Sequence, residues 1–383
     1  MKRKLVTIVL SVAVIASLVI VGCAPEAAPP VPPEEEEAAP PEEEEAPPAA
    51  PEAELYIMDL QAWMPGGSYY KQVEMFCERL ERLSNGQIKV NLHAGGELCP
   101  SCKEFDALES GAIKWAVTCF NFNLGRLGQV ATLTGAVPAG PNATELYAWH
   151  MQGDRKKLMD EIMESADTDV IVVGGPLHLA GAESFGWFKK PITSPDDFKG
   201  MKYRCMGLFG TVAKELGAAV VNLPGGEIYQ AFERGVIDGF EYCTPSMDYS
   251  AGFQDLKAVM HEPGLQSTTA QGELMVRRDT WDAVPENLKT IIIAASEMSM
   301  IDYTWIHMQD AEAMVKFKEA GVEMVNLPED VQMEIYNLVQ EVHHEYCAKD
   351  PLYKKVYDNQ QAFLDKYRIV EYRVQPEYRW KYE

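Results

Sequence analysis

Apolar runs of strand length alternate with helix-like patterns between Gly200 and Asp248. The intervening helix-like segments place apolar residues three and four positions apart, as Ile228, Tyr229 and Phe232 are. Predicted strands cover 201–206, 218–223 and 236–242, and predicted helices cover 208–216 and the segment from Pro224 to Gly235. This strand–helix–strand–helix–strand order predicts a parallel α/β sheet, in which ligands bind beyond the carboxyl ends of the strands.

The same alternation continues through the rest of the chain. Predicted strands cover 55–60, 88–92, 116–121, 169–174, 274–277 and 322–326, and predicted helices cover 69–84, 102–109, 144–150, 155–165, 286–321 and 328–347. The run 169–174 is apolar without interruption, as in a strand buried on both faces, and we expect it to cross between two domains. The expected boundaries are 55–177 with 265–297 for domain I, and 178–264 with 298–383 for domain II.

The first 54 residues have a different composition. Three basic residues at 2–4 precede an apolar run at 5–21, and Gly22 and Cys23 follow, which is the pattern of a secretory signal. An uncleaved membrane anchor is the alternative interpretation of the apolar run, which falls short of a comfortable membrane span. Residues 24–54 are almost wholly Pro, Ala and Glu, so we expect an extended, disordered tether. With either interpretation, the globular part lies outside the cytoplasm.

The charge argues against a nucleic-acid-binding protein, and the cysteine content argues against a disulfide framework or a cysteine metal site. The net charge is −24, to which residues 1–54 contribute −8 through eleven glutamates and three basic residues. The globular part is therefore acidic as well, which argues against nucleic acid as a partner. If Cys23 carries a lipid, seven of the eight cysteines remain, an odd number that cannot all pair. Cys99 and Cys102 have no second pair at metal-ligand spacing, which leaves free thiols or a local disulfide.

Three motifs in the stretch 200–248 carry a family resemblance. Lys202-Tyr203-Arg204, Leu-Pro-Gly-Gly-Glu-Ile-Tyr ending at Tyr229, and Ala-Phe-Glu-Arg-Gly-Val-Ile-Asp-Gly-Phe-Glu ending at Glu241 together resemble the solute-binding proteins of TRAP (tripartite ATP-independent periplasmic) transporters. The resemblance extends in weaker form from about Trp63 to the C-terminus. It implies an α/β, two-domain clamshell of the periplasmic-binding-protein type (type II-like), with a long domain-spanning helix and a C-terminal helical extension. Cys23 after Ile-Val-Gly is similar to the lipobox of bacterial lipoproteins.

The resemblance implies roles for four residues. An arginine at the place of Arg204 grips the substrate carboxylate in the family, and a planar, permanently charged guanidinium suits bidentate contact with a carboxylate. In the branch that binds 2-oxo and 2-hydroxy acids, an Asp-Gly-x-Glu-Trp run gives a glutamate side chain and the aromatic residue's carbonyl to a cation. The similar run here ends in Glu241 and Tyr242. Glu183 stands where that branch has glutamine, and a second carboxylate favours Ca²⁺ over Na⁺.

Each of these residues also has a plainer interpretation. Arg204 could form an ordinary ion pair, and Glu241 could be a solvated carboxylate at a strand end. Glu183 could instead meet a positively charged group on the substrate. Phe122, Trp187 and Tyr242 are candidate aromatic walls of the pocket, although aromatic residues near strand ends more often belong to the core. Asn121 and Asn123 could hydrogen-bond a keto or hydroxyl oxygen.

The resemblance therefore implies an extracytoplasmic receptor rather than an enzyme. The sequence also contains no G-x-S-x-G, H-E-x-x-H, P-loop or dinucleotide-binding pattern. The expected ligand of the receptor is a small organic acid, a 2-oxo or 2-hydroxy acid resembling pyruvate or lactate, bound with Ca²⁺ or Na⁺ and delivered to TRAP membrane subunits. A lipid on Cys23 would hold it at the periplasmic face of the membrane. C-terminal helices exchange between protomers in some relatives, which leaves a homodimer open. The alternatives are a metal-free binding protein for another carboxylate or an amino acid, and a secreted metal-dependent hydrolase.

Overall fold

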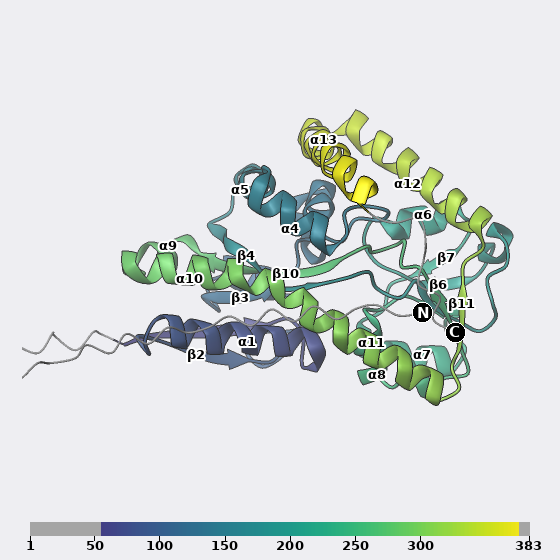
Figure 1. Ribbon diagram of the computed structural model, residues 1–383, viewed down its shortest axis with the longest axis horizontal. Coiled ribbons are helices and arrows are strands. Elements are labelled where there is room, and N and C mark those ends of the chain that lie inside the picture. Colours follow the sequence, from purple (N-terminus) through teal and green to yellow (C-terminus); the bar gives the residue numbers. More distant parts are fainter. Residues whose placement is uncertain (1–54, 375–383) are drawn as a thin grey trace, which may run out of the picture. The chain divides into compact units, whose positions relative to one another are not determined.

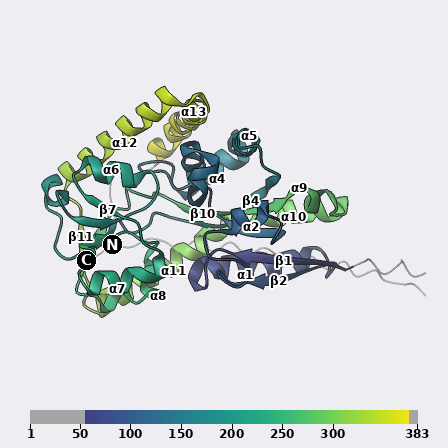
Figure 2. The ribbon, with the colours of Figure 1, turned by 180° about the vertical axis from the view of Figure 1, so that it is seen from behind.

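Two β-sheets organise residues 55–374, the part of the chain that the computed structural model describes (Figures 1 and 2). We call the elements around the five-stranded sheet the first lobe and those around the six-stranded sheet the second lobe. The predicted signal sequence, the lipobox cysteine Cys23 and the tether lie outside the described residues.

The first sheet has the strand order β2-β1-β3-β10-β4. β1 pairs in parallel with β2 and β3, whereas β10 runs antiparallel between β3 and β4. Its strands are β1 (Tyr56–Ala62), β2 (Ile88–His93), β3 (Trp115–Thr118), β4 (Val170–Ala180) and β10 (Ala270–Arg277). β3 is entirely buried and β4 and β10 almost entirely so, which is the state expected of strands covered on both faces.

The second sheet has the strand order β11-β9-β5-β8-β6-β7. β6 pairs in parallel with both β7 and β8, and β5 runs antiparallel between β8 and β9. Its strands are β5 (Gly186–Phe188), β6 (Lys202–Arg204), β7 (Ala219–Val221), β8 (Gly239–Phe240), β9 (Val259–Glu262) and β11 (Glu323–Asn326). The parallel βαβαβ unit predicted for the stretch 200–248 is therefore confirmed.

Helices cover both sheets. The α-helices are α1 (Gly67–Leu83), α2 (Glu104–Glu109), α3 (Leu124–Leu127), α4 (Ala143–Gln152), α5 (Arg155–Ser165), α6 (Phe209–Glu215), α7 (Ile228–Glu233), α8 (Pro245–Ser250), α9 (Arg278–Asp282), α10 (Glu286–Ser299), α11 (Tyr303–Glu319), α12 (Glu329–Lys349) and α13 (Pro351–Val374). Local sequence sets their ends, as at α4, where the Asn142 side chain accepts from the Glu145 main-chain N–H and the Glu145 carboxylate accepts from the Asn142 N–H, both at 2.9 Å. No helix within residues 55–374 has the length and apolar character that crossing a membrane requires.

The predicted domain-spanning helix is confirmed. α10 and α11 are joined by a short 3₁₀ turn at Met300–Asp302 and together make a helix of 34 residues. α10 packs against β4 and α1 of the first lobe, and α11 packs against α8 of the second (Figure 1). Arg79 of α1 fixes the joint, because its guanidinium donates to Ser299 Oγ (2.7 Å) and to both carboxylate oxygens of Asp302 (2.9 and 2.8 Å).

The C-terminal helical extension contacts both lobes. α12 packs against α6 of the second lobe and against α13, which in turn packs on α4, α5 and the 3₁₀ segment Gln129–Thr134 of the first lobe. Trp149 Nε1 donates to Asn359 Oδ1 (2.9 Å), and Gln360 Nε2 donates to the main-chain oxygen of Leu133 (2.7 Å). The extension is therefore an integral part of the folded unit.

Several predicted elements differ in extent from the observed ones, and three strands show the physical reason. β8 spans only Gly239–Phe240 instead of 236–242, because its parallel partner β6 ends at Arg204. β4 continues to Ala180 instead of ending at 174, because register irregularities in β10 accommodate Pro176, a residue that normally interrupts a strand. The strand predicted at 116–121 ends at Thr118, and a 3₁₀ turn at Phe120–Asn123 follows.

Candidate functional site

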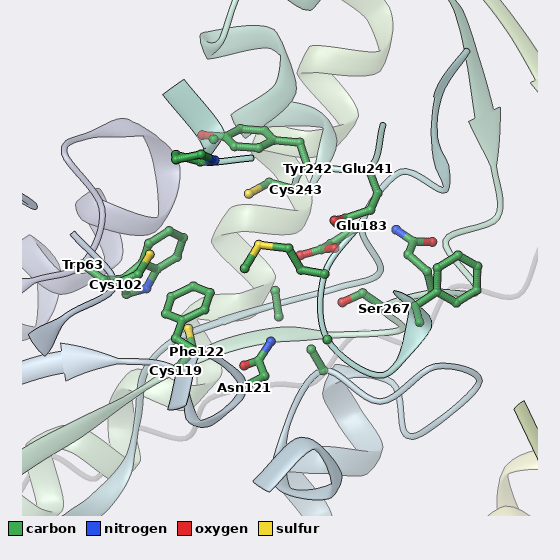
Figure 3. Close-up of a pocket in the computed structure, with 18 of the residues that line it drawn as sticks. Trp63, Cys102, Cys119, Asn121, Phe122, Glu183, Glu241, Tyr242, Cys243 and Ser267 are labelled. Atoms are coloured by element: carbon green, nitrogen blue, oxygen red, sulfur yellow. The ribbon is translucent and has the colours of Figure 1, made fainter. Parts of the chain in front are cut away.

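A cavity of about 650 Å³ lies between the two lobes (Figure 3). The first lobe contributes the loops that follow β1 and β3 and the far end of β4, and the second lobe contributes the loops that follow β6, β7 and β8. Of the predicted site residues, those that line this cavity are Asn121, Phe122, Glu183, Arg204, Glu241 and Tyr242. The fold therefore brings together residues that are more than a hundred positions apart in the sequence.

Arg204 ends strand β6 and is almost completely buried in the cavity wall. Its Nη1 donates to both the main-chain oxygen and Oε1 of Glu241 (2.8 Å each), and its Nε donates to the main-chain oxygen of Leu223 (3.1 Å). Among the described residues, the only hydrogen-bond partner of its Nη2 is the thioether sulfur of Met206, at 3.0 Å. Because a thioether is a weak acceptor, Nη2 is the part of the guanidinium that an incoming carboxylate can most readily take.

Glu241 and Glu183 approach one another from separate segments. Glu241 directly follows β8, and its main-chain N–H donates to the Arg204 carbonyl (3.0 Å). Glu183 lies in the loop between β4 and β5, where its N–H donates to the Ser267 carbonyl (3.0 Å). Gly264 packs so closely on Glu183 that a Cβ there would lie 1.8 Å from the Glu183 carbonyl oxygen. In Figure 3 the two carboxyl groups point toward each other.

Burial and mutual repulsion govern the charge of this acidic pair. Burial raises the pKa of Glu183 well above its usual value, and repulsion from Glu241 and Asp248 raises it further, against the opposing effects of Ser267 and Arg204. Burial also raises the pKa of Glu241, while the Arg204 guanidinium lowers it. When both acids are ionised beside the single guanidinium, one negative charge is in excess, and a bound cation would compensate this charge.

Asn123, which is buried and donates from Nδ2 to the main-chain oxygen of Cys119 (2.9 Å), does not line the cavity, and neither does Trp187. Trp187 lies fully buried on β5, where its indole packs edge-on against Phe253 and Phe317. Its Nε1 donates to Asp248 Oδ2 (2.7 Å), and Asp248 Oδ1 accepts from the Cys243 N–H (3.1 Å). Trp187 therefore acts on the cavity only indirectly, by fixing the segment that follows Tyr242.

Trp63, Tyr69 and His178 line the cavity but were not predicted as site residues. Trp63, in the loop after β1, donates from Nε1 to Nε2 of the buried His178 on β4 (3.2 Å). Tyr69 stacks on the same imidazole with ring centroids 4.7 Å apart. Burial lowers the pKa of His178 to about 3, so its ring is neutral. Trp63 could have been found as an aromatic residue following a predicted strand, whereas His178 lies beyond Pro176 and outside the predicted strand, which ended at residue 174.

Three thiols also line the cavity: Cys102, Cys119 and Cys243. Burial raises the pKa of each of them, so all three remain protonated at neutral pH and supply no thiolate nucleophile. The seven cysteines within residues 55–374 are all free, Cys99 and Cys102 included. The same residues contain no group of three or more His, Cys, Asp or Glu side chains arranged to hold a metal ion. The predicted cation site would not form such a group, because only two of its donors, Glu183 and Glu241, are acidic side chains. Its third donor is the main-chain oxygen of Tyr242.

Glu104, which is hydrogen-bonded to the main chain of Cys102, should make the stability of the protein depend on pH. Its carboxylate accepts from Thr118 Oγ1 and from the Cys102 N–H, both at 3.0 Å, but burial raises its pKa to about 7. Between the usual glutamate pKa of 4.5 and this raised pKa, the folded protein binds more protons than the unfolded chain, so the free energy of unfolding falls as the pH rises.

We therefore expect Glu104→Gln to reduce this decline by up to about 1.4 kcal/mol per pH unit between pH 5 and 7. Urea unfolding of the two proteins at several pH values within this window measures the difference. Parallel stability curves for wild type and variant would contradict the prediction.

The two-lobed α/β fold, with its spanning helix and a cavity that joins one arginine to two acids, defines a ligand-binding protein of the periplasmic-binding-protein class. The chain belongs to the family of bacterial extracellular solute-binding proteins, family 7 (DctP), whose family model matches residues 61–350. It is accordingly a solute-binding protein of the TRAP transporter type that works outside the cytoplasm, and it is not an enzyme.

Individual relatives agree with this assignment. The monocarboxylate 2-oxoacid-binding periplasmic protein all3028 of Nostoc sp. strain PCC 7120 is 30% identical over 305 residues, which cover 79% of this chain and 82% of that protein. The C4-dicarboxylate-binding periplasmic protein DctP of Rhodobacter capsulatus is 25% identical over 259 residues, 66% of this chain and 74% of that protein.

Solved structures share the fold. A TRAP solute-binding protein from Bordetella bronchiseptica, with calcium and picolinate in one site of a mixed-occupancy dimer, has a TM-score of 0.77 at 24% identity and covers 84% of this chain and 96% of that chain. Another from Colwellia psychrerythraea, with bound calcium and pyruvate, has a TM-score of 0.76 at 24% identity and covers 82% and 96%. The predicted fold class is therefore confirmed.

Proposed function

We propose that this protein is the receptor of a TRAP transporter for a small monocarboxylate, a 2-oxo or 2-hydroxy acid, which it binds together with a cation. The observation that carries the proposal is that Arg204, Glu183 and Glu241 line one cavity between the lobes. Relatives with related names or bound ligands support it: all3028 is named for 2-oxoacids, and the Colwellia protein holds calcium and pyruvate.

The Arg204 guanidinium would hold the ligand carboxylate through Nη2 once the Met206 thioether has been displaced. The buried pair Glu183 and Glu241 fits a hard cation, because these acids repel each other and carboxylate oxygens are the donors that Ca²⁺ prefers. The Tyr242 main-chain oxygen would complete this donor set. A bound cation supplies positive charge beside the ligand, and the second carboxylate at Glu183 favours Ca²⁺ over Na⁺.

Closure of two domains, 55–177 with 265–297 and 178–264 with 298–383, would exclude water from this site and strengthen its charge-assisted hydrogen bonds. The loaded receptor would then deliver its ligand to TRAP membrane subunits. A lipid on Cys23 would keep it at the membrane, and a homodimer is compatible with this arrangement.

Thermal unfolding against a panel of acids tests the proposal. With Ca²⁺ present, pyruvate or lactate at a hundredfold excess over its dissociation constant should stabilise the protein by about 2.7 kcal/mol. A chelator should reduce this stabilisation, since the ligand carboxylate would then face Glu183 and Glu241 without the compensating charge. If no 2-oxo or 2-hydroxy acid raises the midpoint temperature of unfolding, either with Ca²⁺ or with chelator, the proposal is wrong.

A metal-free amino-acid receptor is the second candidate, favoured by the carboxylate of Glu183, which could hold an ammonium group in place of a cation. An amino acid that stabilises the protein equally with and without chelator, while pyruvate does not, would select this candidate.

A further inference from the structure

The cavity has two chemically different ends. The carboxyl groups of Glu183 and Glu241 mark the polar end, whereas the rings of Trp63 and Phe122 stand together on the opposite side of the view in Figure 3. The ring of Tyr242 extends from the second lobe toward these two rings. A ligand held by its carboxylate at the polar end would therefore direct its side chain toward aromatic surfaces.

These aromatic walls are held in place by the protein itself. The Trp63 indole is fixed by its hydrogen bond to His178 Nε2 (3.2 Å), and it meets the Phe122 ring edge-on with centroids 5.1 Å apart. The Tyr242 ring packs edge-on against Phe253 at 5.3 Å, and a Cβ at Gly225 would lie only 2.8 Å from it. The walls are thus preorganised, and a ligand that uses them has little side-chain motion to restrict.

The two thiols beside Trp63 and Phe122 are uncharged. Cys102 and Cys119 lie on the same side of the cavity as Trp63 and Phe122 in Figure 3, and burial keeps both thiols protonated. Buried thiols of this kind behave as small apolar groups. A charged or strongly polar ligand group would find no compensating charge among these five side chains, the three rings and the two thiols.

The size of the cavity exceeds what a three-carbon acid can fill. Pockets between about 300 and 1,000 Å³ commonly bury most of the surface of much larger, drug-sized ligands, and this cavity has about 650 Å³. A three-carbon acid held at Arg204 would therefore leave part of the cavity, including the surface of the three rings, without contact.

We propose that the acid bound by this receptor carries a large, flat, apolar side chain, such as an aryl group. This side chain would have Trp63 and Phe122 of the first lobe on one side and Tyr242 of the second lobe on the other. This inference rests on the proposed function, because the carboxylate must be anchored at Arg204 for its side chain to reach the rings. It narrows the ligand from small 2-oxo acids in general to those with an arylmethyl or similar group.

Calorimetric titration with two 2-oxo acids tests the inference. Phenylpyruvate differs from pyruvate only by its phenyl ring, and burial of that ring on aromatic surfaces should tighten binding by at least about tenfold in the presence of Ca²⁺. Phe122→Ala should reduce the ratio of phenylpyruvate to pyruvate affinity by about tenfold. Phe122→Leu, which preserves bulk but not the flat face, should reduce it less.

Tyr147→Ala is the matched control, because Tyr147 is a half-buried aromatic residue of the first lobe that does not line the cavity. It should leave the affinity ratio unchanged. If pyruvate binds as tightly as phenylpyruvate, or if Phe122→Ala leaves the ratio unchanged, the aromatic subsite is refuted while the proposed function stands. If neither acid binds, both proposals fail.

Discussion

Replacing Arg204 by alanine is expected to abolish binding of the organic acid. Arg204 is only 4% exposed, and it is the cationic residue among those that line the cavity. Truncation of one partner in a buried, hydrogen-bonded charge pair costs about 2–5 kcal/mol, which corresponds to an affinity loss of about 30- to 5,000-fold. Calorimetric titration of wild type and variant with the same acid, in Ca²⁺, measures this loss.

Two further variants separate lost recognition from lost structure. Arg204→Lys retains the charge but cannot reproduce the bonds to both Leu223 and Glu241, so we expect an intermediate affinity. Arg277→Ala is the matched control, since Arg277 pairs with Asp279 away from the cavity, and it should bind as wild type does. Wild-type affinity in Arg204→Ala, with an unchanged unfolding midpoint, would refute the anchoring role.

Replacing Arg155 by methionine is expected to produce the largest loss of stability, about 3–5 kcal/mol in the free energy of unfolding. Arg155 and Glu273 form an ion pair in which both side chains are fully buried. Arg155 also donates to the main-chain oxygen of Thr134 (2.9 Å) and pairs with Nδ1 of His150 (3.0 Å). The variant would leave the Glu273 carboxyl group buried without its cation.

Urea unfolding measures the stability loss of Arg155→Met. Repeated at several pH values, it also tests whether the unpaired Glu273 carboxylate causes this loss. Burial already raises the pKa of Glu273 against the lowering effect of Arg155, so the variant should take up a proton at Glu273 more readily. Its deficit in stability should therefore shrink as the pH is lowered from 7 to 5. The double variant with Glu273→Gln should recover part of the loss at pH 7.

Lys199→Ala serves as the control for the stability prediction. Lys199 and Asp196 form an exposed pair, with 68% and 77% of their side chains accessible, and such pairs contribute about 0–1 kcal/mol. A loss at Arg155 no greater than the loss at Lys199 would contradict the account of the buried pair.

Arg155 also connects stability to the ligand cavity. Thr134, whose carbonyl it holds, ends the 3₁₀ segment Gln129–Thr134, and the chain continues through Ala136 and Pro138 in the cavity wall. The buried ion pair therefore stabilises the part of the cavity wall that the first lobe contributes.

Sequence pattern predicted the location of the polar end of the site for a physical reason. Arg204 and Glu241 follow from a βαβαβ pattern, because parallel strands bring their carboxyl ends to one edge of the sheet. Their roles in ligand and cation binding remain predictions. The ion pair between them was not predictable as such, because it depends on the register that sets Arg204 opposite Phe240.

Other features depend on packing that the local sequence does not contain. Trp187 was expected to line the pocket, but a three-residue strand can present a side chain to either sheet face, and tertiary contacts with Phe253 and Phe317 select the core. His178 belongs to a strand that passes through Pro176, which only the irregular pairing with β10 permits. Of the three rings at the aromatic end, Phe122 and Tyr242 were candidates from the sequence, whereas Trp63 was not, because its position depends on its contact with His178.

The most direct test of the central claim is a titration of pyruvate or phenylpyruvate into metal-free protein, followed by the same titration after Ca²⁺ has been added. If Arg204, Glu183 and Glu241 form one site for an anion and its cation, affinity should rise by at least about tenfold on addition of Ca²⁺, and Glu183→Gln should weaken this dependence. Equal affinities with and without the cation, or binding that survives removal of Arg204, would contradict the account.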